Sequence, residues 1–539
     1  MWVRPRVPEY DIAEWRRQPF PDRVRAVCRA WALQGYGSPI AVYLAYVSKI
    51  AAYIAAWVGF CVVGPERSIA NLPTWWASDV AFQKAVLWTM LFEGLGFGCG
   101  SGPLTGRYLP PMGGALYFLR PGTTKLPPWF GGHRRTLLDV ALYAITVAAL
   151  VRALVAPVVG LEHVLPLVVL VPVLGVLDKT LFLVFRSEHY WSVLICLLFP
   201  DWLAGVKVVW LAIWWWAATS KVNAHFPAVM AVMVSNSPFS PTALKKAMYL
   251  DFPDDLRPSR LASGLAHLGT ALEYAFPLVL VLSDGGPVTW VTLGVMTVFH
   301  LFILSEVPMG VPLEWNVIMI YGGWVLFGVH ADTATWAVSS PGLLAWLGAF
   351  HLALPLWGSL YPSQVSFLLA MRYYAGNWAY SVWLFRDGAS AKLDQLVKSS
   401  GPVREQLGWL YDTDTVDALL SKVVAFRLMH LHGRALHDLL PRAVPSMDGY
   451  EWLDGEVVAG MVVGWNFGDG HLHDRQLLQA VQAQCRFLPG ELRVVMVESQ
   501  PLFGSGLAWT IADAHDGELA AGETAVATLS DRQPFPPPA

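Results

Sequence analysis

The chain has 539 residues, of which 55% are hydrophobic and only 14% are charged, and it contains 26 tryptophans. This composition excludes an ordinary soluble protein, because the mean hydropathy is +0.45 and several apolar runs are longer than a water-soluble core helix requires. The net charge of −3 gives no sign of a nucleic-acid partner. We therefore expect an integral protein of the cell membrane, with the lipid bilayer as its first partner.

The first 38 residues form a basic segment. Seven arginines alternate with three tryptophans before any long apolar run begins, a pattern typical of a cytoplasmic, partly amphipathic segment and not of a secretory signal. The positive-inside rule then orients the first membrane span from inside to outside.

Residues 39–385 are predicted to form a bundle of about nine transmembrane helices. The expected spans lie near Ile40–Val63, Val80–Gly98, Leu137–Val159, Val164–Phe185, Val193–Thr219, Leu261–Leu282, Val288–Leu304, Asn316–Val329 and Gly342–Tyr361. The proline within Phe199–Asp201 leaves open a kinked or re-entrant element there. Because nine is odd, this count places the C-terminus outside the cell, although it also places the basic loop Lys245–Arg260 outside.

Residues 386–531 are predicted to form a small soluble α+β domain, followed by a loose tail at 532–539. Charged and apolar residues mix here, with a helical pattern over Val416–Leu440 and strand-like runs at Val457–Val463, Leu492–Glu498 and Leu507–Ala512. The predicted fold class is therefore an all-α polytopic membrane bundle with a small C-terminal α+β domain.

Lys221 is the first candidate for a functional residue. It follows the apolar run Val206–Ser220, and an ammonium group at membrane depth costs about 2.5–3.5 kcal/mol on insertion scales. The alternative is that Lys221 ends a helix and extends its charge to the lipid headgroups. The polar residues elsewhere in the sequence help to distinguish a functional lysine from one that extends to the headgroups.

Further polar residues lie at or within the expected spans. The segment Asp178–Trp191 holds several charged residues, Glu273 lies inside one apolar run and His300 inside the next. Each alone fits a structural role, yet intramembrane Glu and His usually face the bundle interior or a wet cavity. Together they predict that Lys221, His189, Glu273 and His300 line one shared cavity.

These residues also carry a resemblance. The motifs are Glu188–Ser192, Ala217–Phe226 around Lys221, Asn236–Pro241, Glu273, Val298–Leu313 around His300, and Tyr374–Trp378. In order and spacing they resemble the vitamin-K-dependent γ-glutamyl carboxylase and its bacterial relatives with a horizontally transferred transmembrane helix (HTTM) domain. The resemblance covers about Asp178–Trp383. The chain resembles still more closely an uncharacterised group of largely actinobacterial transmembrane proteins with this layout.

The resemblance implies carboxylase- or epoxidase-type lyase chemistry in a membrane cavity, with a menaquinol-like reduced quinone, O₂ and CO₂. It implies catalytic roles for Lys221, His189 and His300, and cofactor contacts for Glu188, Tyr190, Trp191, Trp215 and Glu273. The residue types suit this chemistry. A desolvated lysine amine can act as a base, and histidines can donate hydrogen bonds to an oxyanion on the quinol ring.

The chain also departs from the carboxylase. Glu188 stands where the family has Asn, Lys221 lacks a second lysine on its N-terminal side, and the C-terminal domain is much shorter. We therefore expect a small or lipidic substrate instead of a protein. The alternative is a non-catalytic protein that binds or moves a lipid or quinone and contacts a partner through its C-terminal domain.

Two histidine groups and the cysteines are weaker candidates. His430, His432 and His437, and separately His471 and His473, have spacings that suit a metal, but an exposed helix face and a turn explain them as well. The five cysteines are scattered without the spacing of a zinc or redox site. We expect no metal site and no disulfide framework.

Overall fold

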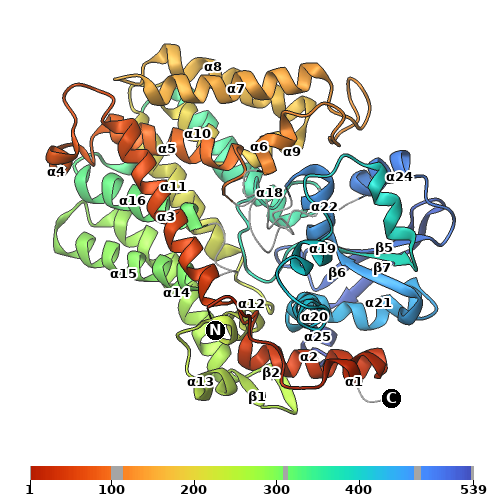
Figure 1. The fold of residues 1–539 in the computed structure, drawn as a ribbon. Coiled ribbons are helices and arrows are strands. Elements are labelled where there is room, and N and C mark those ends of the chain that lie inside the picture. Colours follow the sequence, from red (N-terminus) through yellow and green to blue (C-terminus); the bar gives the residue numbers. More distant parts are fainter. Residues whose placement is uncertain (1, 99–112, 307–312, 466–474, 536–539) are drawn as a thin grey trace.

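The computed structural model describes residues 2–98, 113–306, 313–465 and 475–535, and it consists of a helical membrane part and a C-terminal sheet domain (Figure 1). The helices of the membrane part, with a short hairpin, are α3 (Ile40–Cys61), α4 (Leu72–Trp75), α5 (Asp79–Gly94), α6 (Gly113–Phe118), α7 (Leu137–Val155), α8 (Leu161–Leu177), α9 (Lys179–Val184), α10 (Tyr190–Cys196), α11 (Trp202–Thr219), α12 (Phe226–Asn236), α13 (Thr242–Ala247), β1 (Tyr249–Asp251), β2 (Asp255–Pro258), α14 (Arg260–Leu282), α15 (Gly286–Ser305), α16 (Leu313–Gly323), α17 (Pro341–Leu347) and α18 (Leu354–Leu360).

Six helical segments in the described part of the chain are long and apolar enough to cross a membrane. They are α3, α7, α11, α14, α15 and the continuous stretch Pro341–Leu360 that contains α17 and α18. Three more apolar segments are shorter: α8, α12 and Leu313–Val329. The predicted count of about nine spans is therefore not confirmed, although every predicted span coincides with a helical segment.

Two predicted spans, Val164–Phe185 and Val193–Thr219, are each interrupted by a break between two helices. Asp178 separates α8 from α9 and has extended backbone angles, with its side chain accepting a hydrogen bond from the Thr180 amide. Pro200 lies between α10 and α11, so the predicted span is interrupted there. Asp201 then accepts hydrogen bonds from the Ser339 and Ser340 amides.

Helix α11 lies at the centre of the bundle. In its most apolar window 61% of the residues are buried, against 11% for α3. Trp210 and Trp214 are both fully buried, as expected for a helix that is hydrophobic on all sides. The end of α11 therefore brings Lys221 into the protein interior and not to a lipid-facing surface.

The C-terminal domain is built on a five-stranded antiparallel sheet with the order β4-β3-β5-β6-β7. Its strands and helices are β3 (Tyr380–Arg386), α19 (Val403–Gly408), α20 (Thr413–Met429), α21 (Leu436–Ala443), β4 (Tyr450–Asp454), α22 (Gly455–Val463), α24 (Arg475–Cys485), β5 (Leu492–Val497), β6 (Gly506–Asp513), β7 (Gly517–Ala525) and α25 (Val526–Ser530). The strands predicted at Leu492–Glu498 and Leu507–Ala512 are present as β5 and β6.

Two local predictions in this domain are wrong. The run Val457–Val463 belongs to helix α22, which begins after an Asp454 side chain that accepts from the Glu456 amide and ends at Gly464 with φ of +82°. The predicted boundary after Phe385 assigns Tyr380–Phe385 to the membrane domain, whereas these residues form β3 of the C-terminal sheet. Both faces of β3 are covered, so its residues do not alternate between polar and apolar.

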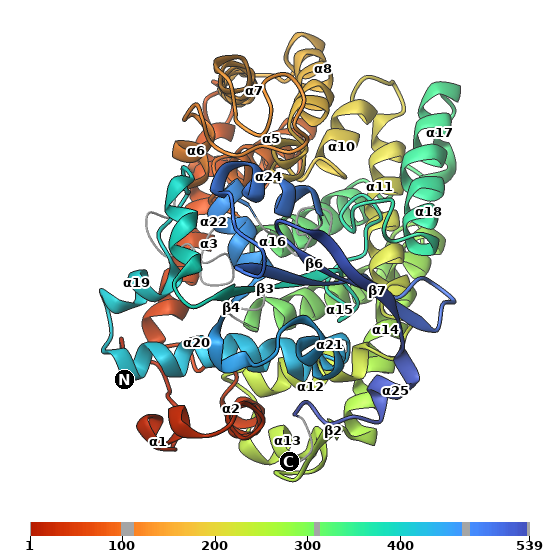
Figure 2. The ribbon, with the colours of Figure 1, turned by 90° about the vertical axis from the view of Figure 1, so that its right-hand side faces the viewer.

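The basic N-terminal segment contains α1 (Ile12–Arg17) and α2 (Phe20–Gln34), and it packs directly on the C-terminal domain. Figures 1 and 2 show these helices beside α20, and α2 contacts both α20 and α12. Lys422 of α20 donates hydrogen bonds to the carbonyl oxygens of Arg6 (2.6 Å) and Tyr36 (3.0 Å). The described part of this segment, residues 2–38, therefore forms one interface with the C-terminal domain.

Candidate functional site

Lys221 forms an ion pair with Glu273 inside the protein. The Lys221 Nζ atom contacts Glu273 Oε2, and the two side chains are 8% and 5% exposed. Glu273 belongs to the inward-facing stripe of α14, whose buried members recur at helical spacing: Ala262, Ala266, Thr270, Glu273, Phe276 and Leu280. Among the described residues, neither side chain has another hydrogen-bond partner. The pair therefore joins the end of α11 to the middle of α14.

Aromatic rings surround the ammonium group of this pair. Lys221 Nζ lies 5.6 Å from the ring centre of Phe226 and 5.7 Å from that of Phe299. A cation within about 6 Å of a ring centre is attracted by the ring quadrupole. The surroundings of the pair are thus apolar and electron-rich, and they are not a headgroup region. This geometry argues against the alternative in which Lys221 extends to lipid headgroups.

His300 lies next to this pair, but both of its ring nitrogens are engaged. Trp214 Nε1 donates to His300 Nε2 (3.2 Å), and His300 Nδ1 lies 2.9 Å from Asn316 Oδ1. An indole nitrogen can only donate, so Nε2 accepts and Nδ1 carries the proton of a neutral ring. In this arrangement His300 has no donor left for a ligand. The oxyanion role predicted for His300 requires the ring to exchange one of these partners.

Glu188 and His189 lie in a separate buried cluster, in the turn between α9 and α10. Arg186 Nε donates to Glu188 Oε1 (2.7 Å), and His189 Nδ1 lies 3.3 Å from the same oxygen. Tyr190 is fully buried. Trp191 donates from Nε1 to the carbonyl oxygen of Val168 (3.0 Å) and therefore packs against α8.

The structure brings some of the predicted site residues together and separates others. Phe299 contacts Lys221 and neighbours His300, so Lys221, Glu273 and His300 share one region. A series of side chains links His300 to the cluster of His189: the ring centres of His300 and Trp315 are 6.1 Å apart, those of Trp315 and Tyr373 are 5.0 Å apart, and Arg186 lies 5.9 Å from the Tyr373 ring. Trp215 points outward, is 40% exposed and stacks edge-on against Tyr274.

The C-terminal domain contributes residues that the sequence reasoning missed. Gln500, in the loop between β5 and β6, faces His225 in the loop that follows Lys221, with Oε1 2.9 Å from His225 Nε2. The Gln500 amide also donates to Asn377 Oδ1 (2.7 Å). A sequence separation of 275 residues between His225 and Gln500 leaves no local pattern that reveals this contact.

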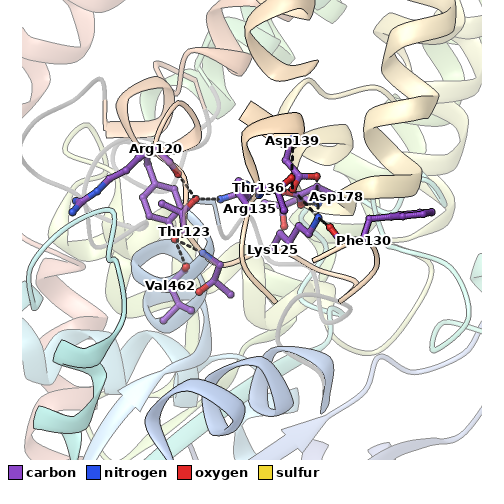
Figure 3. A network of polar contacts seen from close by, with 12 residues as sticks. Arg120, Thr123, Lys125, Phe130, Arg135, Thr136, Asp139, Asp178 and Val462 are labelled. Carbon is purple, nitrogen blue, oxygen red and sulfur yellow. Dashed lines mark hydrogen bonds and ion pairs between the residues drawn. The ribbon is translucent and has the colours of Figure 1, made fainter. Parts of the chain in front are cut away.

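Asp178 belongs to a structural network and not to the Lys221 region. Figure 3 shows that Arg135 Nε donates to Asp178 Oδ2 (2.7 Å), while Lys125 Nζ contacts both Asp139 oxygens at 2.9 and 2.8 Å. Thr136 donates to Asp139 from its amide and its hydroxyl group. Each of these carboxylates thus has a basic partner, and the network connects the loop before α7 to the break between α8 and α9.

His430 and His432 of the C-terminal domain are buried and do not lie on an exposed helix face. His430 Nε2 lies 2.5 Å from the Tyr374 hydroxyl group, and His432 Nδ1 lies 2.6 Å from the Gly376 carbonyl oxygen. Burial lowers the pKa of His430 to about 3 and that of His432 well below its ordinary value. His471 and His473 lie outside the described residues. Within the described ranges, no three metal-binding side chains converge.

Together, the fold and these buried charges define a multi-pass helical membrane protein with a C-terminal β-sheet region. The model of one protein family, a transmembrane protein of unknown function (DUF3556), matches residues 1–539, and the chain belongs to this family. No curated protein and no solved structure matches the chain. The resemblance to the carboxylase and to HTTM proteins stays a prediction.

Proposed function

We propose that the protein is a membrane enzyme that exchanges a proton with a lipid-soluble substrate at the Lys221–Glu273 pair. The observation that carries this proposal is the pair itself: two opposite charges buried among membrane helices, each with the other as its polar partner in the described structure. Ionisable residues in membrane segments are expensive and mark functional pathways more often than not.

The chemistry follows from the close contact between the two groups. A proton that moves from the Lys221 ammonium to the Glu273 carboxylate leaves a neutral amine, which is a base, beside a neutral acid. No net charge is created in the apolar surroundings by this transfer. The pair can then take a proton from a substrate at Lys221 and return it from Glu273.

The proposed substrate class is an apolar compound with an exchangeable proton, and a reduced quinone is the specific candidate. Phe226 and Phe299 lie around the ammonium and suit a planar ring. The fit is incomplete, because His300 already uses both ring nitrogens. We therefore derive no step through a quinone and do not assign carboxylation or epoxidation.

A second candidate function is non-catalytic binding of a lipid or quinone in the same region. Both ring nitrogens of His300 already have partners, Trp214 and Asn316. This favours the binding function, because a site that binds without reacting needs no free acid or base. Both candidates predict a ligand at Lys221. Only the enzyme predicts conversion of that ligand.

The test compares purified wild-type protein with K221M, K221R and E273Q, and with K246M as a matched control because Lys246 is exposed on α13. Mass spectrometry of lipids extracted with the protein should show a compound that is retained by wild type and K246M and lost from K221M. Incubation of this compound with wild type should convert it, whereas K221R, which keeps a permanent charge, should not. Full conversion by K221R would refute the enzyme and leave the binding protein.

We also infer that the N-terminal segment and the C-terminal domain lie on the cytoplasmic side together. The bonds of Lys422 to Arg6 and Tyr36 leave no space for a bilayer between the two parts. The basic loop after α12 lies at the same face, since Arg29 of α2 pairs with Asp254 at 2.7 Å. The positive-inside rule favours the cytoplasm for this face, in place of the expected extracytoplasmic C-terminus.

A pair of reporters tests this topology. Green fluorescent protein fused after Ala539 should fluoresce, and alkaline phosphatase fused at the same point should be inactive, because each works on one side of the membrane only. The reverse result would contradict the same-side arrangement and restore the odd count of spans.

A further inference from the structure

A cavity of about 740 Å³ lies between the N-terminal helices and the C-terminal domain, away from Lys221. One wall comes from α1, α2 and the first turn of α3, and the other from α20, β4 and α22. Its volume falls within the range of about 300–1,000 Å³ that is typical of small-molecule sites. At Val42 the cavity reaches α3, which is the least buried of the candidate spans. A compound dissolved in the membrane surface is therefore close to it.

Arg427 is a buried basic residue in the lining of this cavity. Its side chain is 1% exposed and pairs with Asp454 through Nη2 (2.6 Å) and Nε (3.0 Å). Its third nitrogen, Nη1, has no hydrogen-bond partner among the residues that the structure describes. A buried donor without a partner costs about 1–3 kcal/mol, and a ligand oxygen at this position removes that cost.

The charges around the cavity indicate that its ligand is uncharged. Asp454 neutralises Arg427, Asp417 lies between Arg16 and Arg404, and Asp394 pairs with Lys398. Two further lining carboxylates, Glu405 and Glu451, are exposed to solvent, and Glu451 accepts a hydrogen bond from the Ser390 hydroxyl group. The buried charges of the lining therefore offer no free counter-charge to an added anion or cation. Burial also raises the pKa of Glu456 to about 7, so this lining carboxyl group can donate or accept a hydrogen bond near neutral pH.

The remaining walls are mainly apolar and aromatic. Trp15 and Phe20 of the N-terminal helices and Phe426, Trp452 and Val457 of the C-terminal domain line the cavity, and the ring centres of Phe20 and Trp452 are 6.3 Å apart. Such walls accept a hydrocarbon chain, while Arg427 and Glu456 offer hydrogen bonds at one place. The lining is thus mainly apolar, with buried hydrogen-bonding groups at Arg427 and Glu456 and with more exposed ion pairs such as Arg16–Asp417. This combination suits an amphiphile with one chain and an uncharged head.

We propose that this cavity binds an uncharged single-chain amphiphile of the monoacylglycerol type, with its ester or hydroxyl oxygen at Arg427 Nη1 and its acyl chain against Phe426 and Trp452. This site is independent of the proposed function at Lys221. Because the ligand would touch both walls, it would also hold the N-terminal helices against the C-terminal domain. Bound amphiphile should therefore stabilise this interface by mass action.

The test uses a monoacylglycerol with a photoreactive diazirine in a sixteen-carbon chain, added to the full-length protein in lipid nanodiscs. After illumination, peptide mapping should place adducts in residues 15–27, 419–427 and 447–457. Unlabelled monopalmitoylglycerol should suppress these adducts at least fivefold, while equimolar palmitate or a cationic amphiphile of the same chain length should not. Suppression by palmitate as strong as that by monopalmitoylglycerol would overturn the uncharged headgroup.

A cavity-filling variant keeps the proposal falsifiable without removing Arg427. Val457→Trp places a larger side chain at a half-buried lining position and should reduce the cavity adducts at least fivefold, while adducts on the membrane helices stay unchanged. Leu410→Trp is the control, since Leu410 is 59% exposed and outside the lining. Cavity adducts that are absent in wild type, or equal in wild type and V457W, would overturn the site.

Discussion

Two buried sets of charges in this protein each pair a basic with an acidic side chain, but their surroundings differ. In the network of Figure 3, Asp139 is contacted by Lys125 and Thr136, and Asp178 is contacted by Arg135 and the Thr180 amide. In the other set, Lys221 and Glu273 contact each other and are surrounded by aromatic rings. Both are buried, so burial does not distinguish them.

The difference lies in how many partners hold each charge in place. Asp178 is the N-cap of α9, and Asp139, in the first turn of α7, accepts from the Thr136 amide. Their positions are therefore determined by the backbone. The Lys221–Glu273 pair begins no helix and can change its protonation or its partner without unfolding a helix end. Asp139 and Asp178, which hold the fold, each have several partners. Lys221 and Glu273, which we propose for chemistry, have each other as their polar partner in the described structure.

The largest effect should follow from breaking the saturated network. Arg135→Leu leaves Asp178 buried without its cation, which should lower stability by about 3–5 kcal/mol. The apparent melting temperature of the detergent-solubilised protein measures this loss. Arg134→Ala is the control, because Arg134 is exposed and its removal should change stability by less than about 0.5 kcal/mol. Equal melting temperatures for the two variants would show that the network is not structural.

Breaking the Lys221–Glu273 pair should lower stability less than Arg135→Leu does, and it should lower activity more. Lys221→Met and Glu273→Gln should each destabilise by about 1–2 kcal/mol, the range of polar contacts between membrane helices. The double variant should recover part of this loss, because no unpaired charge remains. Melting curves of the four proteins give the coupling energy. A loss as large as that of R135L would place the pair with the structural charges.

The interface between the N-terminal segment and the C-terminal domain should respond to pH. Burial lowers the pKa of Lys422 from 10.5 to about 7, so above pH 7 the unfolded chain binds more protons than the folded chain. The free energy of unfolding should therefore rise with pH, by at most about 1.4 kcal/mol per unit. Above pH 9 the effect is opposed, since burial raises the pKa of the Cys28 thiol to about 12.

Melting temperatures between pH 7 and 9 test this prediction, with Lys422→Met as the comparison. The variant should show a flatter profile in this window than wild type, because it has no ammonium group to bury. Parallel profiles for the two proteins would show that Lys422 keeps its ordinary pKa.

The smallest effect should come from the ion pairs at the surface of the same interface. Arg16 contacts Asp414 at 2.8 Å and also pairs with Asp417, but its side chain is 34% exposed. Arg16→Ala should therefore cost about 0.2–1 kcal/mol, and less in high salt. The rate at which a protease cleaves the N-terminal segment, at low and at high salt, measures this change. A salt-independent difference would point to lost packing of the arginine stem.

The sequence predicts where the apolar helices lie, because long apolar runs have few alternatives, but in the described residues six segments and not nine are long and apolar enough to cross a membrane. It fails at β3, where Val382–Phe385 is apolar throughout, since hydropathy does not separate a membrane span from a strand that is buried on both faces. Its partners β4 and β5 follow much later in the chain. It fails at α22 because the valines favour a strand, whereas the residues that cap the helix, Asp454 and Gly464, decide the outcome.

The candidate site is predictable in part. A lysine and a glutamate in apolar runs are visible in the sequence, and the structure brings Lys221 and Glu273 into contact. The partners of His300 are not visible, because Trp214 and Asn316 are polar groups in ordinary helical positions of other elements. Likewise, His430 is buried by residues of the segment before β3, and no local pattern reveals that contact.

The contact between α2 and α20 has a consequence for how the protein is made. The apolar face of α2, which contains Val24, Val27 and Trp31, is synthesised first, yet part of its cover is made several hundred residues later. Until α20 leaves the ribosome, this face remains open to chaperones or to the membrane surface. The contact between the two ends of the chain therefore forms last. A nascent chain that stops before α20 would keep the apolar face of α2 exposed.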